Sequence, residues 1–417
     1  MGDTLRSVAK YCLLLILALA APPAAIPMGG PVPRPLDLIA ASPSRPPFSG
    51  RLSPESLLVK SLLEIQHARM DKALSDINAV LRLNPNFKLA HLIKGDLLLA
   101  RAQAITNLGN VPNAPAQQVA GLRDEARVRL QRYLEQPPLN LIPRYLLQLQ
   151  PQQKYAIVVD TSKSRLYLFK NQDGVPRYVA DYYVTSGKNG AEKVKEGDER
   201  TPIGVYFVTS SLSKTQLGDF YGPEAFPISY PNEWDKRMGR NGHGIWLHGT
   251  PGSTYSRPPR ASNGCVVLTN PDLNALGKVL QIGLTPVIIS DGIDWIDAEE
   301  WREQRKTLEH QLETWRRDWE SMDTARYLSH YAKDFRAGAQ DLTQWARQKR
   351  QVNEHKSWIK VNLSRVSIFG YPGKDDMAVV TFDQDYKSNN LSNQMRKRQY
   401  WKLENHRWKI VYEGAVG

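Results

Sequence analysis

Cys265 is the residue whose type and neighbours most directly indicate chemistry in this chain. It lies in Ser262-Asn263-Gly264-Cys265, and His248-Gly249 stands 17 residues before it, across a loop rich in glycine, proline and serine. A nearby imidazole lowers the pKa of a thiol and supplies the nucleophilic thiolate near neutral pH. The alternative is a cysteine that serves as a small buried hydrophobic residue. The glycine and asparagine beside Cys265 favour the nucleophile.

Both motifs lie at the ends of stretches that alternate as β-strands do. In the predicted strand 244–248, Trp246 and His248 share one face, and in the predicted strand 265–269, Cys265 shares a face with Val267. A histidine that ends one strand and a cysteine that begins another can meet across a sheet. We therefore expect the loop between them to close a pocket over the pair.

Candidate substrate-binding groups surround this pair. The backbone N–H groups of Asn263 and Gly264 are suited to stabilise a developing oxyanion. The predicted substrate-binding residues are Trp246, Arg260, Ser262, Asn263 and Gly264.

A zinc site is the alternative chemistry for the same part of the sequence. His243, His248 and Cys265 offer three ligands, but no second cysteine or paired acid completes a shell of four. His243 and His248 are five residues apart, which places them on opposite faces of one strand unless Gly242 and Gly244 interrupt it. We expect neither a metal nor a cofactor.

The N-terminus predicts export. Arg6 and Lys10 precede the apolar run Tyr11–Ala20, which ends in the small-residue pattern Ala18-Leu19-Ala20. We assign residues 1–25 to a signal peptide for the periplasm, with an uncleaved inner-membrane anchor as the alternative, and 26–52 to a Pro-rich linker. Removing the signal would leave Cys265 as the one cysteine of the mature chain, although exported proteins normally pair their cysteines.

Residues 53–136 have a helical pattern, and we assign 53–150 to a helical segment. Ser53-Pro54 suits a helix start, and an offset of 34 residues aligns leucines and alanines in a manner that resembles tetratricopeptide repeats. About two repeats are visible, which is too few for an independent solenoid. We expect a structural cap on the neighbouring domain, and the alternative is a groove for a protein partner.

Residues 154–291 change to a β-rich pattern with long loops and little helix, and residues 300–417 change again. In the last segment a predicted helix, Trp301–Tyr331, precedes four predicted strands, an order that resembles the cone-shaped α+β fold of nuclear-transport-factor-like domains. Residues 301–417 hold 22 Lys and Arg against 15 Asp and Glu, which is +7 of the total charge of +13. Such charge suits anionic polymers or membrane surfaces, and we expect this segment to serve placement on such a partner or a homodimer, and to bind no nucleic acid.

The central segment resembles the YkuD-type catalytic domain of L,D-transpeptidases. The resemblance rests on His248-Gly249, on Ser262-Asn263-Gly264-Cys265, on Arg200-Thr201-Pro202-Ile203-Gly204 and on the hairpin around Tyr155–Phe169. It implies a sandwich-like, mainly β domain within a multidomain chain.

The same resemblance implies the roles of the residues. Cys265 would be the nucleophile, His248 the general base and acid, and the Gly249 carbonyl the partner of the histidine. The substrate would be a peptidoglycan tetrapeptide stem, attacked at diaminopimelate and passed to an amine. The alternatives are hydrolysis, as in an L,D-carboxypeptidase or amidase, and a silent wall-binding scaffold. Many members carry arginine where this chain has Val267, and Arg257 or Arg260 could replace it.

Overall fold

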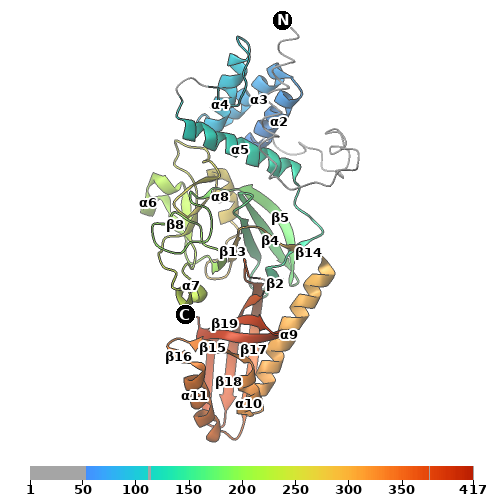
Figure 1. The fold of residues 1–417 in the computed structure, drawn as a ribbon, viewed down its shortest axis with the longest axis vertical. Coiled ribbons are helices and arrows are strands. Elements are labelled where there is room, and N and C mark those ends of the chain that lie inside the picture. The colour runs from blue at the N-terminus through green and yellow to red at the C-terminus, as the bar shows by residue number, and fades with distance from the viewer. Residues whose placement is uncertain (1–52, 111–113, 375, 417) are drawn as a thin grey trace. The chain divides into compact units, whose positions relative to one another are not determined.

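The computed structural model describes residues 53–110, 114–374 and 376–416 (Figure 1). The chain divides into two compact units. Unit 1 contains the chain up to Glu135 together with the separate segment Ser253–Pro258, and unit 2 contains Gln136–Gly252 and Pro259–Gly417. The predicted signal peptide (1–25) and linker (26–52) lie outside the described residues. Within the described ranges, no helix is long and apolar enough to cross a membrane.

Unit 1 is helical. The cap of its first helix is reciprocal, since Ser53 accepts the Ser56 N–H and Ser56 in turn accepts that of Ser53. A buried cluster that includes Leu58, Ile77 and Phe87 joins the helices. The helices described in this unit are α2 (Pro54–Gln66), α3 (Met70–Leu83), α4 (Lys88–Leu99) and α5 (Ala116–Leu134).

The last helix of unit 1 stops close to the end of the predicted helical stretch, 53–136, and before the end of the assigned segment, 53–150. It ends at Leu134, because Pro137 and Pro138 follow and proline cannot continue a helix. The residues after these prolines form the short strands β1 (Ile142–Pro143) and β2 (Leu146–Gln148), which belong to unit 2.

The central part of unit 2 is a sandwich of two sheets. A five-stranded sheet has the order β5-β4-β3-β13-β7, and a four-stranded sheet has the order β12-β10-β9-β8. One buried cluster contains side chains from both sheets, including Ile157, Leu247 and Val266. The strands are β3 (Tyr155–Asp160), β4 (Arg165–Gln172), β5 (Val175–Tyr183), β7 (Gly204–Phe207), β8 (Leu212–Ser213), β9 (Glu224–Pro227), β10 (Trp246–His248), β12 (Val266–Val267) and β13 (Pro286–Ser290).

Smaller elements complete this domain. Two two-stranded sheets pair β1 with β14 and β6 with β11. The remaining elements are β6 (Ser186–Gly187), β11 (Arg260–Ser262), β14 (Trp295–Ile296), α6 (Lys214–Leu217), the 3-10 turn η1 (Asp219–Tyr221), α7 (Glu233–Arg237) and α8 (Asn270–Gly277).

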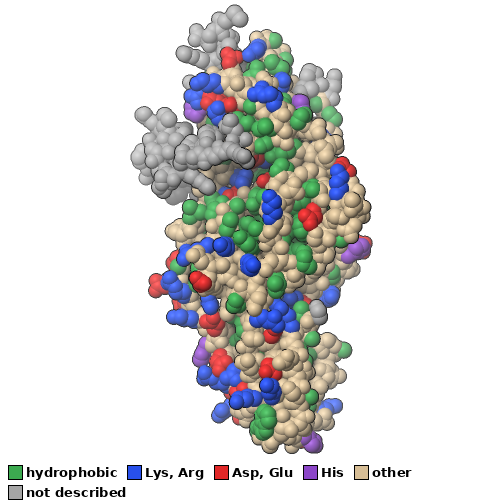
Figure 2. All heavy atoms as spheres, turned by 180° about the vertical axis from the view of Figure 1, so that it is seen from behind, with side chains coloured by type: hydrophobic (Ala, Val, Ile, Leu, Met, Phe, Trp, Pro, Cys, Tyr) green, Lys and Arg blue, Asp and Glu red, His purple; other side chains and the backbone are tan. Residues whose placement is uncertain are grey.

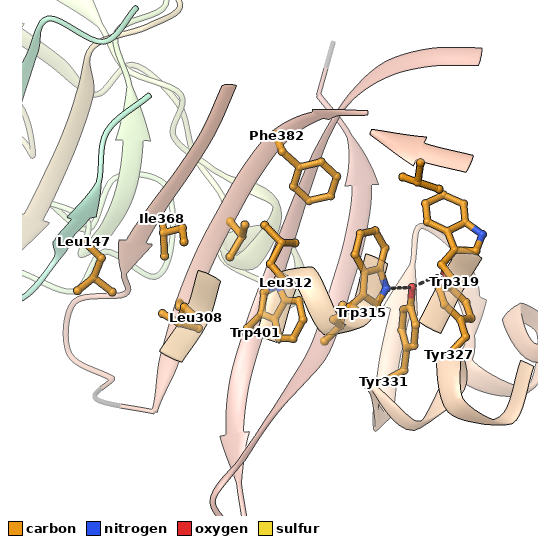
Figure 3. Close-up of a cluster of buried hydrophobic side chains, with 14 of the residues drawn as sticks. Leu147, Leu308, Leu312, Trp315, Trp319, Tyr327, Tyr331, Ile368, Phe382 and Trp401 are labelled. Carbon is orange, nitrogen blue, oxygen red and sulfur yellow. Dashed lines mark hydrogen bonds between the residues drawn. The ribbon is translucent and has the colours of Figure 1, made fainter. Parts of the chain in front are cut away.

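The C-terminal part of unit 2 is a curved sheet with helices on one face. Its seven strands have the order β16-β15-β20-β19-β18-β17-β2. Residues of α9 such as Leu312 and Trp315 pack against Phe382 and Trp401 of the sheet (Figure 3). The elements are α9 (Ala298–Glu320), α10 (Thr324–Ser329), α11 (Leu342–Glu354), β15 (Tyr331–Ala337), β16 (Gln340–Asp341), β17 (Ile359–Gly370), β18 (Met377–Ser388), β19 (Leu391–Glu404) and β20 (Arg407–Ala415).

The predicted helix Trp301–Tyr331 was wrong in its length. It divides into α9 and α10 at Met322, which has a positive φ of 59°, and Tyr331 begins strand β15. The aromatic spacing that suggested one helix is satisfied across the break, since the rings of Tyr327 and Tyr331 lie 5.1 Å apart. The fold class itself, a helical segment, a mainly β domain and an α+β domain, is confirmed.

Candidate active site

Cys265 immediately precedes strand β12, beside the strand that ends at His248. The two strands are parallel, with Leu247 opposite Val266 and His248 opposite Val267. Opposite residues of paired strands point to the same side of a sheet, and side chains alternate along each strand. His248, Val267 and Cys265 therefore face one side. The thiol is partly exposed, and its Sγ donates a hydrogen bond to the Gly244 carbonyl at 3.3 Å.

His248 is buried and oriented by the backbone. Its Nδ1 lies 2.7 Å from the carbonyl oxygen of Gly249. Because a carbonyl can only accept, Nδ1 carries the proton, and the lone pair of the neutral ring lies on Nε2. This is the carbonyl that the family resemblance implies as the partner of the histidine.

Position 249 must be glycine because the Asn270 side chain lies against its Cα. A Cβ at this position would lie 2.2 Å from Oδ1 of Asn270. The Asn270 side chain accepts the Thr250 N–H at 2.8 Å and donates to the Thr250 carbonyl at 2.9 Å. A side chain at position 249 would displace Asn270 from the Thr250 backbone, so glycine is needed directly after His248.

Ser262 and Gly264 shape the turn that presents the thiol. The Ser262 hydroxyl donates to the carbonyl of Cys265 at 2.6 Å and accepts the Gly264 N–H at 3.1 Å. Gly264 has a φ of +123°, and a Cβ there would lie 2.7 Å from the Arg200 carbonyl. The Gly264 N–H is engaged within the turn, so a role as oxyanion donor would require this bond to break. Asn263 is exposed.

Thr201 ties this turn to a second loop. Its buried hydroxyl accepts the Gly187 N–H and donates to the Gly264 carbonyl, each at 2.9 Å. This contact gives a physical reason for the Thr-Pro-x-Gly stretch. The sequence marked the stretch only as part of the family pattern and gave Thr201 no role.

Aromatic side chains that the sequence did not indicate lie around His248. The Tyr221 ring meets His248 edge-on at 5.1 Å and Trp246 at 4.8 Å, and Phe220 lies 6.5 Å from His248 with 55% of its surface exposed. The Tyr221 carbonyl also accepts the Gly249 N–H at 2.9 Å. Only Trp246 was predicted, because η1 is distant from both motifs in sequence.

The position of the missing family arginine is apolar and buried. Val267 is 2% exposed, and its backbone exchanges two hydrogen bonds of 2.9 Å with Thr185. Of the two proposed replacements, Arg260 lies in β11 of unit 2 and is exposed, whereas Arg257 lies in the segment of unit 1.

His243 lies outside strand β10, with 80% of its side chain exposed and Glu196 at 3.6 Å. In the part of the chain that the structure describes, no group of three or more His, Cys, Asp or Glu side chains is arranged to hold a metal ion.

Two family models match the chain. The L,D-transpeptidase catalytic domain, YkuD, matches residues 154–289, and the Cds6 C-terminal NTF2-like domain matches residues 307–414. Among solved structures, Bd1075 of Bdellovibrio bacteriovorus is 30% identical with a TM-score of 0.59, and the match covers 66% of this chain and 98% of that one. The chain belongs to the YkuD family of L,D-transpeptidases.

A second relative of this family has a described biological role. Pgp2 of Campylobacter jejuni, a helical cell shape determining protein, is 27% identical with a TM-score of 0.55, and the match covers 65% of this chain and 95% of Pgp2. A search of curated proteins found no match. The match to the L,D-transpeptidase catalytic domain indicates a family of cell-wall enzymes, and the matched residues include His248-Gly249 and the turn that ends at Cys265.

Proposed function

We propose that this chain is an exported, cysteine-dependent acyltransferase that acts on peptidoglycan tetrapeptide stems in the periplasm. The observation that carries the proposal is the 2.7 Å contact between Nδ1 of His248 and the Gly249 carbonyl, one strand away from a partly exposed thiol. This contact leaves Nε2 as the basic nitrogen, the form in which a histidine accepts a proton from a nucleophile.

The reaction proceeds in two halves. In the first, Sγ of Cys265 attacks the carbonyl carbon at the L-centre of diaminopimelate, and His248 takes the thiol proton. The C–N bond to D-alanine breaks, and the imidazolium returns the proton to the departing amine. In the second, an acceptor amine attacks the thioester carbon and gives a proton to His248. The C–S bond then breaks, and the proton returns to sulfur.

Hydrolysis is the second candidate, and Val267 is the observation that favours it. A fixed arginine can hold a carboxylate with two hydrogen bonds, whereas Val267 is apolar and buried. An acceptor that is held less firmly competes less well with water for the thioester. The products then show the loss of D-alanine without a new cross-link.

A covalent probe tests the nucleophile. Wild-type protein should release D-alanine from tetrapeptide muropeptides and gain the mass of a carbapenem, because thiol acyltransferases of this family form stable thioesters with that class. Cys265→Ala should show neither, with its circular dichroism unchanged. An equal adduct on the alanine variant, or none on wild type, would refute the thiol mechanism. It would favour the alternative of a catalytically silent wall-binding scaffold.

The role of His248 is tested separately through the pH dependence of thiol alkylation. His248→Ala should raise the pH midpoint for reaction of Cys265 with iodoacetamide, because the thiolate loses its imidazolium partner. His243→Ala is the matched control, since that ring is exposed and lies outside β10. An unchanged midpoint in His248→Ala would show that another group activates the thiol.

A further inference from the structure

The loop between the two catalytic motifs is divided between the two units. His248–Gly252 and Pro259–Cys265 belong to unit 2, whereas the six residues between them, Ser253–Pro258, belong to the helical unit. We name Ser253–Pro258 the loop apex. Its contacts within unit 1 are therefore contacts of an active-site loop.

Three residues of the apex contact the helices of unit 1. The Ser256 hydroxyl donates to Oε1 of Glu125 at 2.6 Å. The ring of Tyr255 packs on that of Phe87 with centroids 4.5 Å apart. Pro258 packs closely on Gly121, since a Cβ added to Gly121 would lie 3.1 Å from Cγ of Pro258.

The helical side of this contact is buried and charged. Glu125 and Arg129 are each 1% exposed, and Arg129 Nε donates to Glu125 at 3.0 Å. Arg129 also pairs with Glu55 of α2 and lies 5.4 Å over the Phe87 ring. Burying an ion pair costs desolvation energy, which makes it weak evidence for stability. Its geometry here presents a carboxylate oxygen to the hydroxyl of Ser256.

The stems of the loop are fixed independently of the apex. On the His248 side, the Thr250 backbone is held by Asn270, and the Gly252 N–H donates to Asp219 at 3.0 Å. On the Cys265 side, the Pro259 carbonyl accepts the Ser186 N–H at 2.8 Å. Release of the apex therefore leaves the histidine and the thiol in place.

We propose that the helical unit is a binding module for this apex, and that it positions the loop as a rim for the substrate. Phe87 and Glu125 are positioning residues that act through Tyr255 and Ser256. Holding the rim lowers the KM for a peptidoglycan stem and leaves the reactivity of the thiol unaltered. The part that concerns KM rests on the proposed function, whereas the binding of the apex does not.

The test compares two matched alterations of the apex in the full chain. Tyr255→Ala combined with Ser256→Ala removes both side-chain anchors, whereas Ser253→Ala removes a hydroxyl from an exposed apex residue. Hydrogen exchange of the apex amides should accelerate about tenfold in the double variant, as expected for loss of a hydrogen bond to a carboxylate. The rate should stay within twofold of wild type in Ser253→Ala. Tyr255→Phe with Ser256→Thr should restore protection.

Kinetics separate positioning from a general loss of structure. The double variant should raise the KM for tetrapeptide muropeptides several-fold, with kcat and the pH midpoint of Cys265 alkylation unchanged. Glu125→Gln should act in the same direction from the helical side, and Asp124→Asn, one residue earlier on α5, should not.

Each outcome decides a different claim. Unchanged exchange in the double variant would overturn the binding of the apex. Faster exchange with an unchanged KM, or a displaced alkylation midpoint, would overturn the role as a substrate rim. If wild-type protein turns over no muropeptide, the proposed function fails. In that case the dissociation constant of the same muropeptide, measured by calorimetry, takes the place of KM. It should rise several-fold in the double variant.

Discussion

The L,D-transpeptidase domain is connected to its two neighbours in different ways. With the C-terminal domain it shares a hydrophobic core, in which Phe207 of β7 lies 6.2 Å from Phe369 of β17, ring centre to ring centre. The helical unit has a core of its own and contains only the six-residue apex of one catalytic loop. The C-terminal domain is therefore part of one folding unit with the sandwich, whereas the helical unit folds around a core of its own.

The shared core arises because the central sheet is buried on both faces. Along β3, Ile157 and Val159 pack toward the second sheet of the sandwich, and Ala156 and Val158 pack with residues of the C-terminal sheet. Strand β2, which precedes the sandwich in sequence, pairs with β17 of the C-terminal sheet. Strands buried on both faces carry continuous apolar runs, as Ala156–Val159 does.

The largest expected effect follows from removing the C-terminal domain. A chain that ends at Asp291 should lose cooperative unfolding, because one side of the shared core is exposed to water. In the full chain, Phe369→Ala should lower the free energy of unfolding by about 3–5 kcal/mol. Trp358→Ala, in the same domain but 46% exposed, should change it by less than about 1 kcal/mol. Urea denaturation followed by circular dichroism measures both.

This expectation reverses what the sequence alone suggests for residues 300–417. The sequence treats them as a separable domain for placement or dimerisation, which predicts that a chain ending near Asp291 remains folded and reactive. A truncated chain that unfolds cooperatively and accepts a carbapenem would restore that interpretation. It would also remove the contrast between the two neighbours.

A smaller effect is expected from the ion pair that links the same two domains. Arg398 of β19 donates to both carboxylate oxygens of Glu233 at 3.0 Å, and Tyr400 donates to one of them at 2.9 Å. Burial alone would raise the pKa of Glu233, but the charge of Arg398 and these bonds outweigh it and lower the pKa. The pair therefore stabilises the fold above the ordinary pKa of the carboxyl and loses this contribution as pH falls below it.

The substitution that tests this pair is Glu233→Gln. It should cost about 3 kcal/mol at pH 7, because it leaves a buried guanidinium without its charged partner, and the cost should shrink in acid. Glu404→Gln, on the same strand as Arg398 and in a pair that is more than a third exposed, should cost less than about 1 kcal/mol. Equal effects of the two substitutions would mean that the link between the domains depends on apolar packing alone.

The sequence indicated the motifs of the site better than it indicated their surroundings. Cys265 and His248 were predicted from residue type and local spacing, which short motifs preserve, and the role of the Gly249 carbonyl came from the family resemblance. Tyr221 could not be found in this way, because its ring reaches His248 through folding and not through sequence proximity. The shared core was also hidden, since a strand buried on both faces has the same pattern whichever domain covers its second face.

The smallest expected effect lies within the sandwich itself and depends on neither neighbour. Asp198 holds the loop before Thr201, where it accepts hydrogen bonds from Lys193 at 2.7 Å and from the backbone N–H groups of Val194, Lys195 and Arg200. Burial works against the charged form, but these bonds lower the pKa of Asp198 from 3.8 to about 2. Such a depressed pKa contributes about 2 kcal/mol of stability at neutral pH.

That contribution is fully present above pH 3.8 and is lost as the pH falls toward 2, because the folded carboxylate then takes up the proton that the unfolded chain has already bound. Asp198→Asn should therefore lower the free energy of unfolding by about 2 kcal/mol at pH 7 and by little at pH 2. Glu199→Gln, in the exposed pair with Lys188, should change it by less than about 1 kcal/mol at either pH. Because Thr201 joins this loop to the Cys265 turn, Asp198→Asn should also alter the rate of Cys265 alkylation. Loss of stability without a change in that rate would show that the loop stabilises the sandwich without positioning the thiol.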